Sequence, residues 1–392
     1  MTVEPIYLDH AATTPVDPHA LEAMMPFFGE SYGNPSSVHA LGRKAEEAIE
    51  TARQDIAAVL NCAPNEVVFT SCATESNNLA LRGVAWRAQR DGGPVHIITT
   101  PVEHHAVGKT AEQLRDRFGV ELTVVPVDRY GRVDPDDIRA ALRPHTALVS
   151  VMLANNEVGT VQPVAEIAAV TREAGVYLHT DAVQGAGQLS LDVGELGVDL
   201  LALSAHKFYG PKGVGILYVR QGIELVPSQS GGSHERGRRA GTSNVPYVVG
   251  MAKALQIAHE RRDADAAHYH TLRARLVDGV LDQIDGAQLT GHPQHRLPNN
   301  ASFAFEDVDG NNLLVHLDVA GIAASSGSAC KTGDPEPSDV LTAMGFGPEW
   351  ALGGLRLTLG RGSTEVHVER VLDVLPDKVA RVRELSGKLA AV

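Results

Sequence analysis

A lysine that directly follows an apolar run is the first candidate for chemistry in this sequence. Lys207 lies in the string Ser204–Gly213, immediately after Asp199–Leu203, which has the composition of a buried strand. Desolvation at such a strand end lowers the pKa of an amine and makes it nucleophilic enough to form a Schiff base with a carbonyl group. Most lysines after strands are nevertheless solvated, and Lys212, among glycines and a proline, is expected to lie on the surface of a loop.

An aspartate strengthens the case for Lys207. Asp181 ends the strand pattern Val176–Thr180, and one predicted helix separates it from the lysine. A carboxylate in this place can keep a pyridine nitrogen protonated, which makes pyridoxal 5'-phosphate (PLP) an electron sink. An aspartate that caps a strand-to-helix turn would give the same pattern. Gln184, three residues on, can donate to the phenolate oxygen of the ring or lie exposed on a helix.

Two further segments have residues that suit such a cofactor. Thr70–Asn78 runs from a strand end into a helix N-terminus, whose free N–H groups and hydroxyls attract anions such as phosphate. Helix capping boxes produce similar strings. His104 follows the strand pattern Val95–Thr100, where an imidazole can stack on a flat cofactor and move protons near neutral pH. A lone histidine in such a place is more often structural.

Cys330 is the candidate nucleophile among the three cysteines of the chain. Small residues surround it in Ser325–Pro337 and prolines end the run, which indicates an exposed loop. An exposed thiol beside Lys331 can be partly ionised, and the thiolate is the reactive form. We interpret Cys62 as inert packing and expect no chemical role for Cys72.

The elements that must position these residues follow from the hydrophobic pattern. Short apolar runs alternate with amphipathic stretches from about residue 43 to about residue 220, which predicts an α/β fold with a mainly parallel central sheet. Ligands of such sheets collect at the carboxyl ends of the strands. The predicted strands are Glu66–Thr70, Val95–Thr100, Glu121–Pro126, Thr146–Met152, Val176–His179, Leu200–Ser204 and Gly215–Val219.

The pattern changes beyond about residue 245. A long helical stretch, a few strands and a C-terminal helix predict a second, smaller α+β domain. We therefore expect a large domain over residues 15–255 and a small domain over residues 1–14 and 256–392, the latter carrying the Cys330 loop.

Composition excludes several classes of protein. The 392 residues carry a formal net charge of −14, so the surface as a whole repels nucleic acid and anionic membrane. No apolar stretch is long enough to span a bilayer, and no secretory signal is recognisable at the N-terminus. An odd number of cysteines without metal-ligand spacing argues against a disulfide framework. We expect a soluble protein of the reducing cytoplasm.

Taken together, the strings resemble in their order those of the cysteine desulfurases, a family of class V aminotransferase-like, fold type I PLP enzymes with helices on both faces of the central sheet. The resemblance covers nearly the whole chain. It implies that Lys207 forms the Schiff base with PLP. It also implies that Asp181 pairs with the pyridine nitrogen, Gln184 contacts the ring hydroxyl and His104 stacks on the ring. The matching strings are Leu8–Pro15, Gly33–Ser37, Ala73–Ser76, Asn155–Gly159, His179–Gln184, Ser204–Lys207 and Arg239–Thr242.

The same resemblance assigns residues to the phosphate and to the substrate. It implies an obligate homodimer in which Thr242 reaches the phosphate from the neighbouring subunit, while Asn156 lies beside cofactor and substrate. Arg356 matches the position that pairs with the carboxylate of L-cysteine, which suits a planar bidentate donor. Without the family context, a structural ion pair would be the favoured interpretation. Asn34 is expected to assist at that carboxylate. The residues expected to hold the phosphate from within the chain are Ala73, Thr74, Ser204 and His206.

The string Ser325–Cys330 is similar to the branch of the family that carries its cysteine on a long loop, although Lys331 replaces the small polar residue expected next. The resemblance implies that sulfur leaves L-cysteine as a persulfide on Cys330, with L-alanine as product. It further implies transfer of that sulfur to an iron-sulfur scaffold and other acceptors, with Cys330 as a transient ligand of a [2Fe-2S] cluster. The alternatives are a selenocysteine lyase, another class V aminotransferase, or a non-catalytic sulfur-assembly hub.

Overall fold

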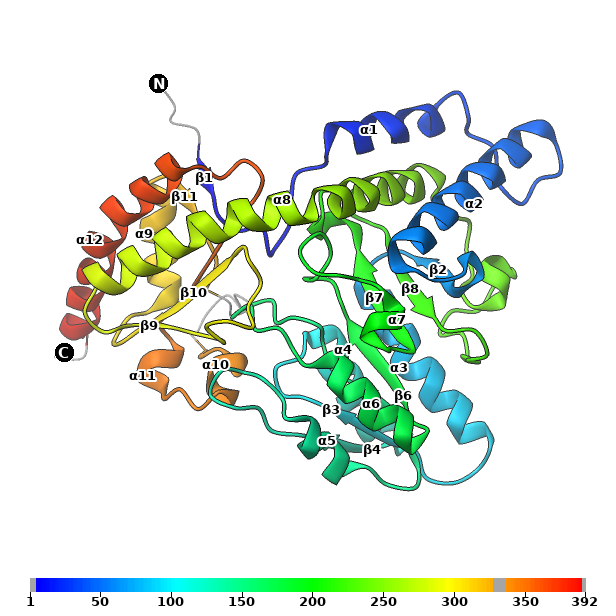
Figure 1. The fold of residues 1–392 in the computed structure, drawn as a ribbon, viewed down its shortest axis with the longest axis horizontal. Helices are drawn as coiled ribbons and strands as arrows, with labels where there is room; N and C mark the ends of the chain where they lie inside the picture. The colour runs from blue at the N-terminus through cyan, green and yellow to red at the C-terminus, as the bar shows by residue number, and fades with distance from the viewer. Residues whose placement is uncertain (1–4, 327–335, 390–392) are drawn as a thin grey trace.

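The computed structural model describes residues 5–326 and 336–389, so Cys330 and Lys331 lie outside the described residues. A large sheet and a small sheet lie on opposite sides of the molecule, and the 39-residue helix α8 (Val245–Gln283) runs along both of them (Figure 1). The first half of α8 belongs to the core of the large sheet and the second half to the core of the small sheet. One helix therefore joins two separate hydrophobic cores.

Seven strands form the large sheet, in the order β2-β8-β7-β6-β5-β3-β4. All neighbours pair in parallel except β8, which is antiparallel to both β2 and β7. Only a short connection joins β7 to β8, and parallel pairing would need a long crossover. The strands are β2 (Val67–Thr70), β3 (His96–Thr99), β4 (Glu121–Val124), β5 (Thr146–Ser150), β6 (Tyr177–Asp181), β7 (Leu200–Ser204) and β8 (Gly215–Val219).

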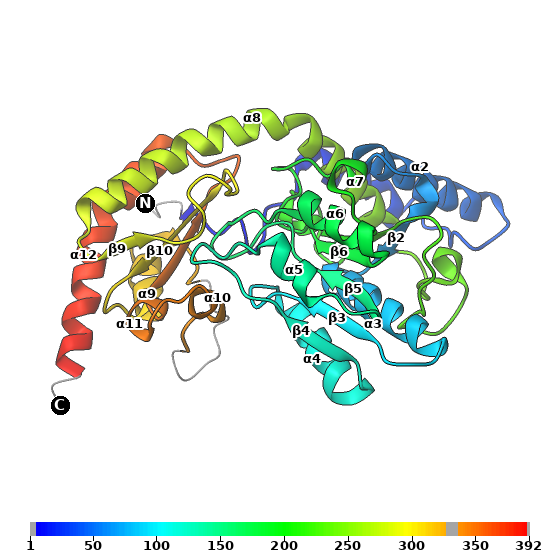
Figure 2. The same cartoon turned by 60° about the horizontal axis from the view of Figure 1, so that its bottom comes forward.

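Helices cover both faces of the large sheet (Figure 2). Successive residues of a strand point to opposite faces, so Val68 packs with α3 and α4 while Val67 packs with α2 and the first half of α8. A strand covered on both sides must be apolar throughout, as β7 is. The helices of this part are α2 (Ala40–Leu60), α3 (Ala73–Arg90), α4 (His105–Phe118), α5 (Pro135–Ala141), α6 (Val164–Ala174) and α7 (Val193–Leu196).

The small sheet has the order β12-β10-β9 and is antiparallel. The parallel pair β1 and β11 is tied to β12 by single bridges from Asp9 and Ser325. The remaining elements are β1 (Ile6–Tyr7), β9 (Ala287–Leu289), β10 (Asn300–Phe305), β11 (Ile322–Ala323), β12 (Gly354–Thr358), α1 (Pro18–Met24), α9 (Gly310–Val319), α10 (Asp339–Ala343), α11 (Pro348–Ala351) and α12 (Glu365–Leu389). Short 3-10 helices are η1 (Met25–Phe28), η2 (Pro64–Glu66), η3 (Ala205–Lys207) and η4 (His234–Gly237).

The structure confirms the predicted fold class. Each strand predicted for the large sheet is present, with ends within two residues of the prediction. The largest extension is in β6, which continues past the predicted end at His179 because Asp181 still pairs with Ala202 of β7. The boundaries of the two domains stay a prediction. In residues 5–326 and 336–389, no helix has the length and apolar character needed to cross a membrane.

Candidate active site

A cavity of about 330 Å³ opens at the carboxyl ends of β6 and β7, where an open α/β sheet usually binds its ligand. Its volume is within the range of small-molecule sites. The structure brings together in its wall most of the side chains that the sequence singled out. They are Ala73, Thr74, His104, Asn156, Asp181, Gln184, Ser204, His206, Lys207 and Arg356.

Lys207 ends the short turn that follows the fully buried strand β7. Its Nζ donates to the backbone carbonyls of Ala11 and Ala12, at 2.5 and 2.7 Å. Burial, with a smaller contribution from the positive charge of Arg356, lowers the pKa of Lys207 to about 8. A substantial fraction of the amine is therefore neutral near physiological pH, as a nucleophile requires. Lys212 is exposed, as predicted for a surface loop.

Asp181 lies at the end of β6, in the cavity wall, and is 5% exposed. Its Oδ1 accepts from the backbone N–H of Val183 at 3.1 Å, so the turn-capping role that the sequence left open is real. Its Oδ2 accepts from Nδ2 of Asn77 at 2.6 Å. The carboxylate is thus held on both oxygens while it faces the cavity. Gln184 is also buried, and its Nε2 donates to the carbonyl of Ala11 at 3.0 Å, which excludes the exposed alternative.

Asn77 is a residue of the site that the sequence prediction missed. It lies one helical turn into α3 and is fully buried, and its Oδ1 has no hydrogen-bond partner among the described residues. The string containing it was noted only for phosphate binding. Nothing in the local spacing shows that this face of α3 meets the end of β6, since that contact joins residues 104 positions apart.

Replacing Asn77 with alanine is expected to weaken PLP binding roughly ten- to hundredfold, since one lost hydrogen bond to a buried charged group is worth about 1.5–3 kcal/mol. Oδ2 of Asp181 then loses its donor, and the carboxylate is free to rotate out of the orientation in which it faces the cavity. Titration of the cofactor-free protein with PLP, followed by absorbance, measures the change. Asn78→Ala is the matched control, because Asn78 donates to Thr74 O of its own helix. Equal affinities in the two variants would contradict the role of Asn77.

The beginning of α3, for which an anion site is predicted, lies in the cavity wall. Its N-cap residue, Cys72, makes no side-chain hydrogen bond to the helix, so the first N–H groups stay available beside Ala73 and Thr74 in the cavity wall. Gly215 of β8 lies against this end, and a Cβ there would be only 2.7 Å from the carbonyl carbon of Cys72. The sheet and the helix N-terminus therefore approach closely. Burial lowers the pKa of His206, across the cavity, to about 4, so its ring is neutral.

His104 both caps a helix and lines the cavity. It is the N-cap of α4, and its Nδ1 accepts from the backbone N–H of Ala106 at 3.1 Å. The neutral ring therefore carries its hydrogen on Nε2. Burial lowers the pKa of His104, with the charge of Asp181 acting in the opposite direction. The helix cap fixes the orientation of an imidazole that lines the cavity.

Glu103 lies next to His104 and is buried among polar groups. Its Oε1 accepts from Thr100 Oγ1 at 3.1 Å and from the backbone N–H of Met152 at 2.8 Å, while its Oε2 has no partner among the described residues. Burial raises the pKa of Glu103 to about 8, and the backbone hydrogen bond from Met152 only partly opposes it. The carboxyl group is therefore protonated in the folded protein at neutral pH.

We expect Glu103 to make stability fall as pH rises. The folded state binds the proton more tightly than the unfolded chain, so its contribution is complete below about pH 4.5 and is lost as pH rises through about 8. In Glu103→Gln, the free energy of unfolding should fall less with pH. We expect its decrease between about pH 5 and about pH 9 to be smaller than in the wild type by roughly 2 kcal/mol or more. Urea unfolding at both pH values measures it, with Glu46→Gln, at an exposed position of α2, as control. An unchanged slope for Glu103→Gln would contradict the prediction.

Arg356 lies in β12 and reaches the cavity from the small sheet. Its Nη2 donates to Asp9 Oδ1 at 2.8 Å and its Nη1 to the carbonyl of Asn156 at 2.7 Å. Its buried Nε has no hydrogen-bond partner among the described residues. The structural ion pair that was the alternative interpretation is therefore present, and it holds the guanidinium in the cavity wall. The sequence pattern of Leu8–Pro15 indicates no role for Asp9, which in the structure is the ion-pair partner of Arg356.

Two predicted site residues lie outside the cavity of their own chain. Asn34 is exposed, and its Oδ1 accepts from the N–H of Ser36. Thr242 is exposed as well. Their predicted roles stay predictions. Cys62 packs against the large core, and burial raises its pKa to about 12, which agrees with inert packing, while Cys72 lines the cavity.

The donor set of the cavity fits PLP. Lys207 offers an amine for the carbonyl group, Asp181 a carboxylate for the pyridine nitrogen, and the start of α3 offers N–H groups for the phosphate. The fold and the site together define a PLP-dependent enzyme of fold type I.

Comparison with known proteins identifies the family of the chain. The model of the aminotransferase class-V family matches residues 6–371. A cysteine desulfurase IscS of Methanosarcina thermophila is 47% identical over 97% of this chain and 93% of that protein, and one of Anaeromyxobacter dehalogenans is 48% identical over 97% and 94%. The chain belongs to the aminotransferase class-V family and, within it, to the cysteine desulfurases.

Solved structures agree with this placement. A NifS-like protein superposes with a TM-score of 0.90 at 39% identity, covering 96% of this chain and all of that one. A structure described as SspA in complex with cysteine has a TM-score of 0.79 at 36% identity, covering 90% of this chain and 98% of that one.

Proposed function

We propose that this protein removes sulfur from L-cysteine, releases L-alanine and holds the sulfur as a persulfide on Cys330 before passing it to an acceptor protein. The observation that carries the proposal is that one cavity holds both Lys207, with a depressed pKa, and Arg356, a bidentate donor for a carboxylate. In the proposed complex, Arg356 binds the carboxylate of the amino acid and Lys207 acts at its Cα. The names of the relatives and the cysteine complex of SspA support L-cysteine as that amino acid.

Each residue of the cavity has a defined task in this reaction. PLP, when bound, supplies the electron sink. Asp181 keeps the pyridine nitrogen protonated, and Lys207 removes and returns a proton at the substrate Cα. His104, whose ring is neutral, takes the proton of the substrate thiol. Arg356 binds the substrate carboxylate and fixes its orientation.

The sulfur transfer itself falls to Cys330. Its thiolate forms an S–S bond with the substrate sulfur as the Cβ–S bond breaks, and the remaining three-carbon skeleton takes up a proton and leaves as alanine. A second thiol, from an acceptor protein, then attacks the persulfide. Cys330 returns to the thiolate state in that step, so the cycle needs no external oxidant.

Both flanks of the segment that contains Cys330 lie beside the cavity. Ser325 exchanges two backbone hydrogen bonds with Arg356, at 2.6 and 3.2 Å. On the other flank, Ser338 Oγ donates to Glu157 Oε2 at 2.6 Å, and Glu157 directly follows Asn156 of the cavity wall. These anchors support the proposal that Cys330 meets a substrate held at Arg356.

An apolar arm supports the proposed homodimer. The segment from α1 to the start of α2 exposes large apolar side chains, and a second copy of the chain is the occupant we propose for this surface. Asn34 is an exposed residue of the same arm. The exposed side chains are Leu21, Met25, Phe28, Tyr32 and Val38, of which Val38 is 90% exposed.

Charge on this arm should separate the subunits. The double variant Met25→Glu and Val38→Glu is expected to sediment as a monomer and to bind PLP more weakly, because two exposed charges oppose burial of the surface. Val366→Glu, at an exposed valine of α12, is the control and should leave the mass unchanged. A wild-type protein that sediments as a monomer would refute the homodimer.

The acceptor we propose is an iron-sulfur scaffold in a cytoplasmic setting, with Cys330 as a transient [2Fe-2S] ligand. This part rests on the likeness of the Ser325–Cys330 string to the long-loop branch of the family and on the low cysteine content. Copurification of acceptor proteins with the wild-type protein tests the partner, and the Cys330→Ala variant is the control bait. An absorbance spectrum of the complex tests the cluster.

Incubation of the purified protein with L-cysteine and a reducing thiol tests the function. Equal amounts of L-alanine and sulfide are expected. Pyruvate formed with a keto-acid acceptor would indicate an aminotransferase, and turnover of L-selenocysteine alone would indicate a selenocysteine lyase. Purified protein without a PLP absorbance band would favour the non-catalytic hub.

A further inference from the structure

Tyr209, two residues after Lys207, has a left-handed backbone with φ of 66°. This region favours glycine, and a bulky side chain there is strained. The next residue is a glycine for a different reason, because a Cβ on Gly210 would lie 2.8 Å from that of Ala205. The backbone N–H groups of Phe208 and Gly210 both donate to the carbonyl of Ala205, so Lys207 lies on a tightly closed turn.

The N-terminal segment holds this turn on both sides of Lys207. The backbone N–H of Tyr209 donates to Thr14 Oγ1 at 2.8 Å, and the carbonyl of Tyr209 accepts from the N–H of Asp17 at 2.8 Å. Thr14 also donates through its N–H to the carbonyl of His206 at 2.9 Å. The strained conformation is therefore fixed by partners outside the turn.

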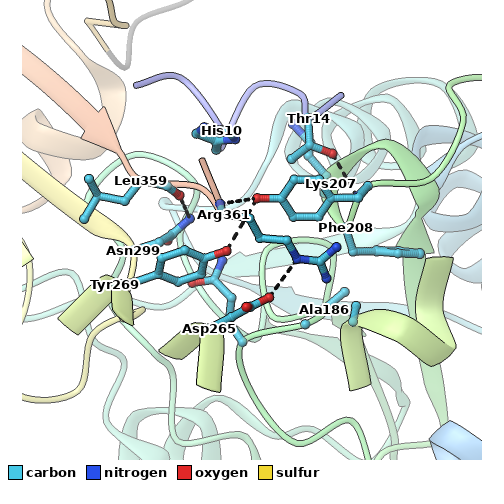
Figure 3. Close-up of a pocket in the computed structure, with 14 residues that line it drawn as sticks. His10, Thr14, Ala186, Lys207, Phe208, Asp265, Tyr269, Asn299, Leu359 and Arg361 are labelled. Carbon is cyan, nitrogen blue, oxygen red and sulfur yellow. Dashed lines mark hydrogen bonds and ion pairs between the residues drawn. The ribbon is translucent and has the colours of Figure 1, made fainter. Parts of the chain in front are cut away.

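The side chain of Tyr209 is held from the small-sheet side. Its hydroxyl accepts from the backbone N–H of Arg361 at 2.8 Å and lies 3.4 Å from the hydroxyl of Tyr269. The Arg361 guanidinium lies 4.1 Å from the centre of the Tyr209 ring. Arg361 also pairs with Asp265 at 2.8 Å and with Asp17 at 3.1 Å. Figure 3 shows Arg361 beside Asp265 and Tyr269, in a small pocket that also contains Lys207.

We propose that Tyr209 is a positioning residue for Lys207. Its hydroxyl and ring connect the turn that carries Lys207 to Arg361, three residues beyond the end of β12, and to Tyr269 of α8. Glycine at this position would give the same backbone without strain. The tyrosine offsets the strain with contacts to Arg361 and Tyr269, and those contacts set where the turn and the lysine amine lie relative to Arg356 across the cavity. The proposal rests on the assignment of Lys207 in the proposed function.

Two substitutions separate strain from anchoring. Tyr209→Phe keeps the ring and the strain but removes the hydroxyl, and Tyr209→Gly removes the strain together with the anchor. Both are expected to speed PLP release roughly two- to tenfold, the worth of one hydrogen bond, and to shift the pH midpoint of the visible cofactor band. Arg361→Lys retains the positive charge but loses the planar guanidinium that stacks on the Tyr209 ring, and it should change PLP release in the same direction. Tyr130→Phe is the control, because the Tyr130 hydroxyl contacts the neighbouring Arg129.

The outcomes are distinguishable. If Tyr209→Phe and Arg361→Lys lower the melting temperature but leave PLP release and the pH midpoint unchanged, Tyr209 is merely structural and the proposal is overturned. If Tyr209→Gly releases PLP more slowly than wild type, strain rather than anchoring dominates, which also overturns it. A visible cofactor band that persists in the Lys207→Ala variant would instead refute the proposed function, and this proposal with it.

Discussion

Replacing Lys207 with alanine is expected to abolish alanine production, with a loss of at least roughly 10²–10⁴-fold from the missing proton transfer alone. The variant also loses the covalent attachment of PLP, so the pH-sensitive visible band of the protein should disappear. Absorbance spectra and alanine release from L-cysteine measure the two effects. Lys207→Arg should fail as well, because a guanidinium keeps its proton at neutral pH and cannot attack a carbonyl group.

Lys212→Ala is the matched control for this prediction. Lys212 is exposed on the loop that follows the same turn, so its loss changes the local charge without touching the cavity wall. Normal turnover is expected. A visible band that persists in Lys207→Ala and vanishes in Lys212→Ala would contradict the assignment of the lysine.

Replacing Cys330 with serine is expected to remove sulfur transfer while PLP remains bound. Lys207 and Asp181 are unchanged in this variant, so exchange of the substrate Cα proton with solvent should continue. Persulfide on the protein, detected by mass spectrometry after alkylation, should be absent, and alanine formation should fall by about 10²-fold or more. Proton exchange and alanine formation therefore separate the two halves of the reaction.

The other two cysteines serve as controls. Burial holds the pKa of Cys62 at about 12, so its thiol stays protonated and unreactive near neutral pH. Cys62→Ser and Cys72→Ser should both keep persulfide formation. Full turnover in Cys330→Ser, or its loss in Cys72→Ser, would move the nucleophile away from Cys330.

The strands and most of the cavity wall were predictable because their signals are local. A buried strand such as β7 is a continuous apolar run, and the polar residues directly after it must lie at the edge of the sheet. Asp181 and Lys207 follow that rule. The sequence motifs of the family supplied their partners, such as Arg356, which local pattern alone would have assigned to a structural ion pair.

The supporting contacts were not predictable from spacing. Asn77 meets Asp181, Asp9 meets Arg356 and the carbonyl of Ala11 meets Lys207, and each pair joins elements far apart in the chain. Which face of a helix or loop turns toward another element depends on the packing of whole layers. The antiparallel direction of β8 differs from these contacts because its cause is local: the connection from β7, which contains Lys207, is too short for a parallel crossover.

The bridge from Asp9 to Thr358 and the ion pair from Asp9 to Arg356 have a consequence for biosynthesis. The ion pair joins residues 347 positions apart, and the N-terminal segment that carries Asp9 also holds Lys207. During translation, Lys207 leaves the ribosome long before β12 does, and domains fold as their residues emerge. The substrate side of the cavity, where Arg356 lies, therefore stays incomplete until nearly the whole chain has been made.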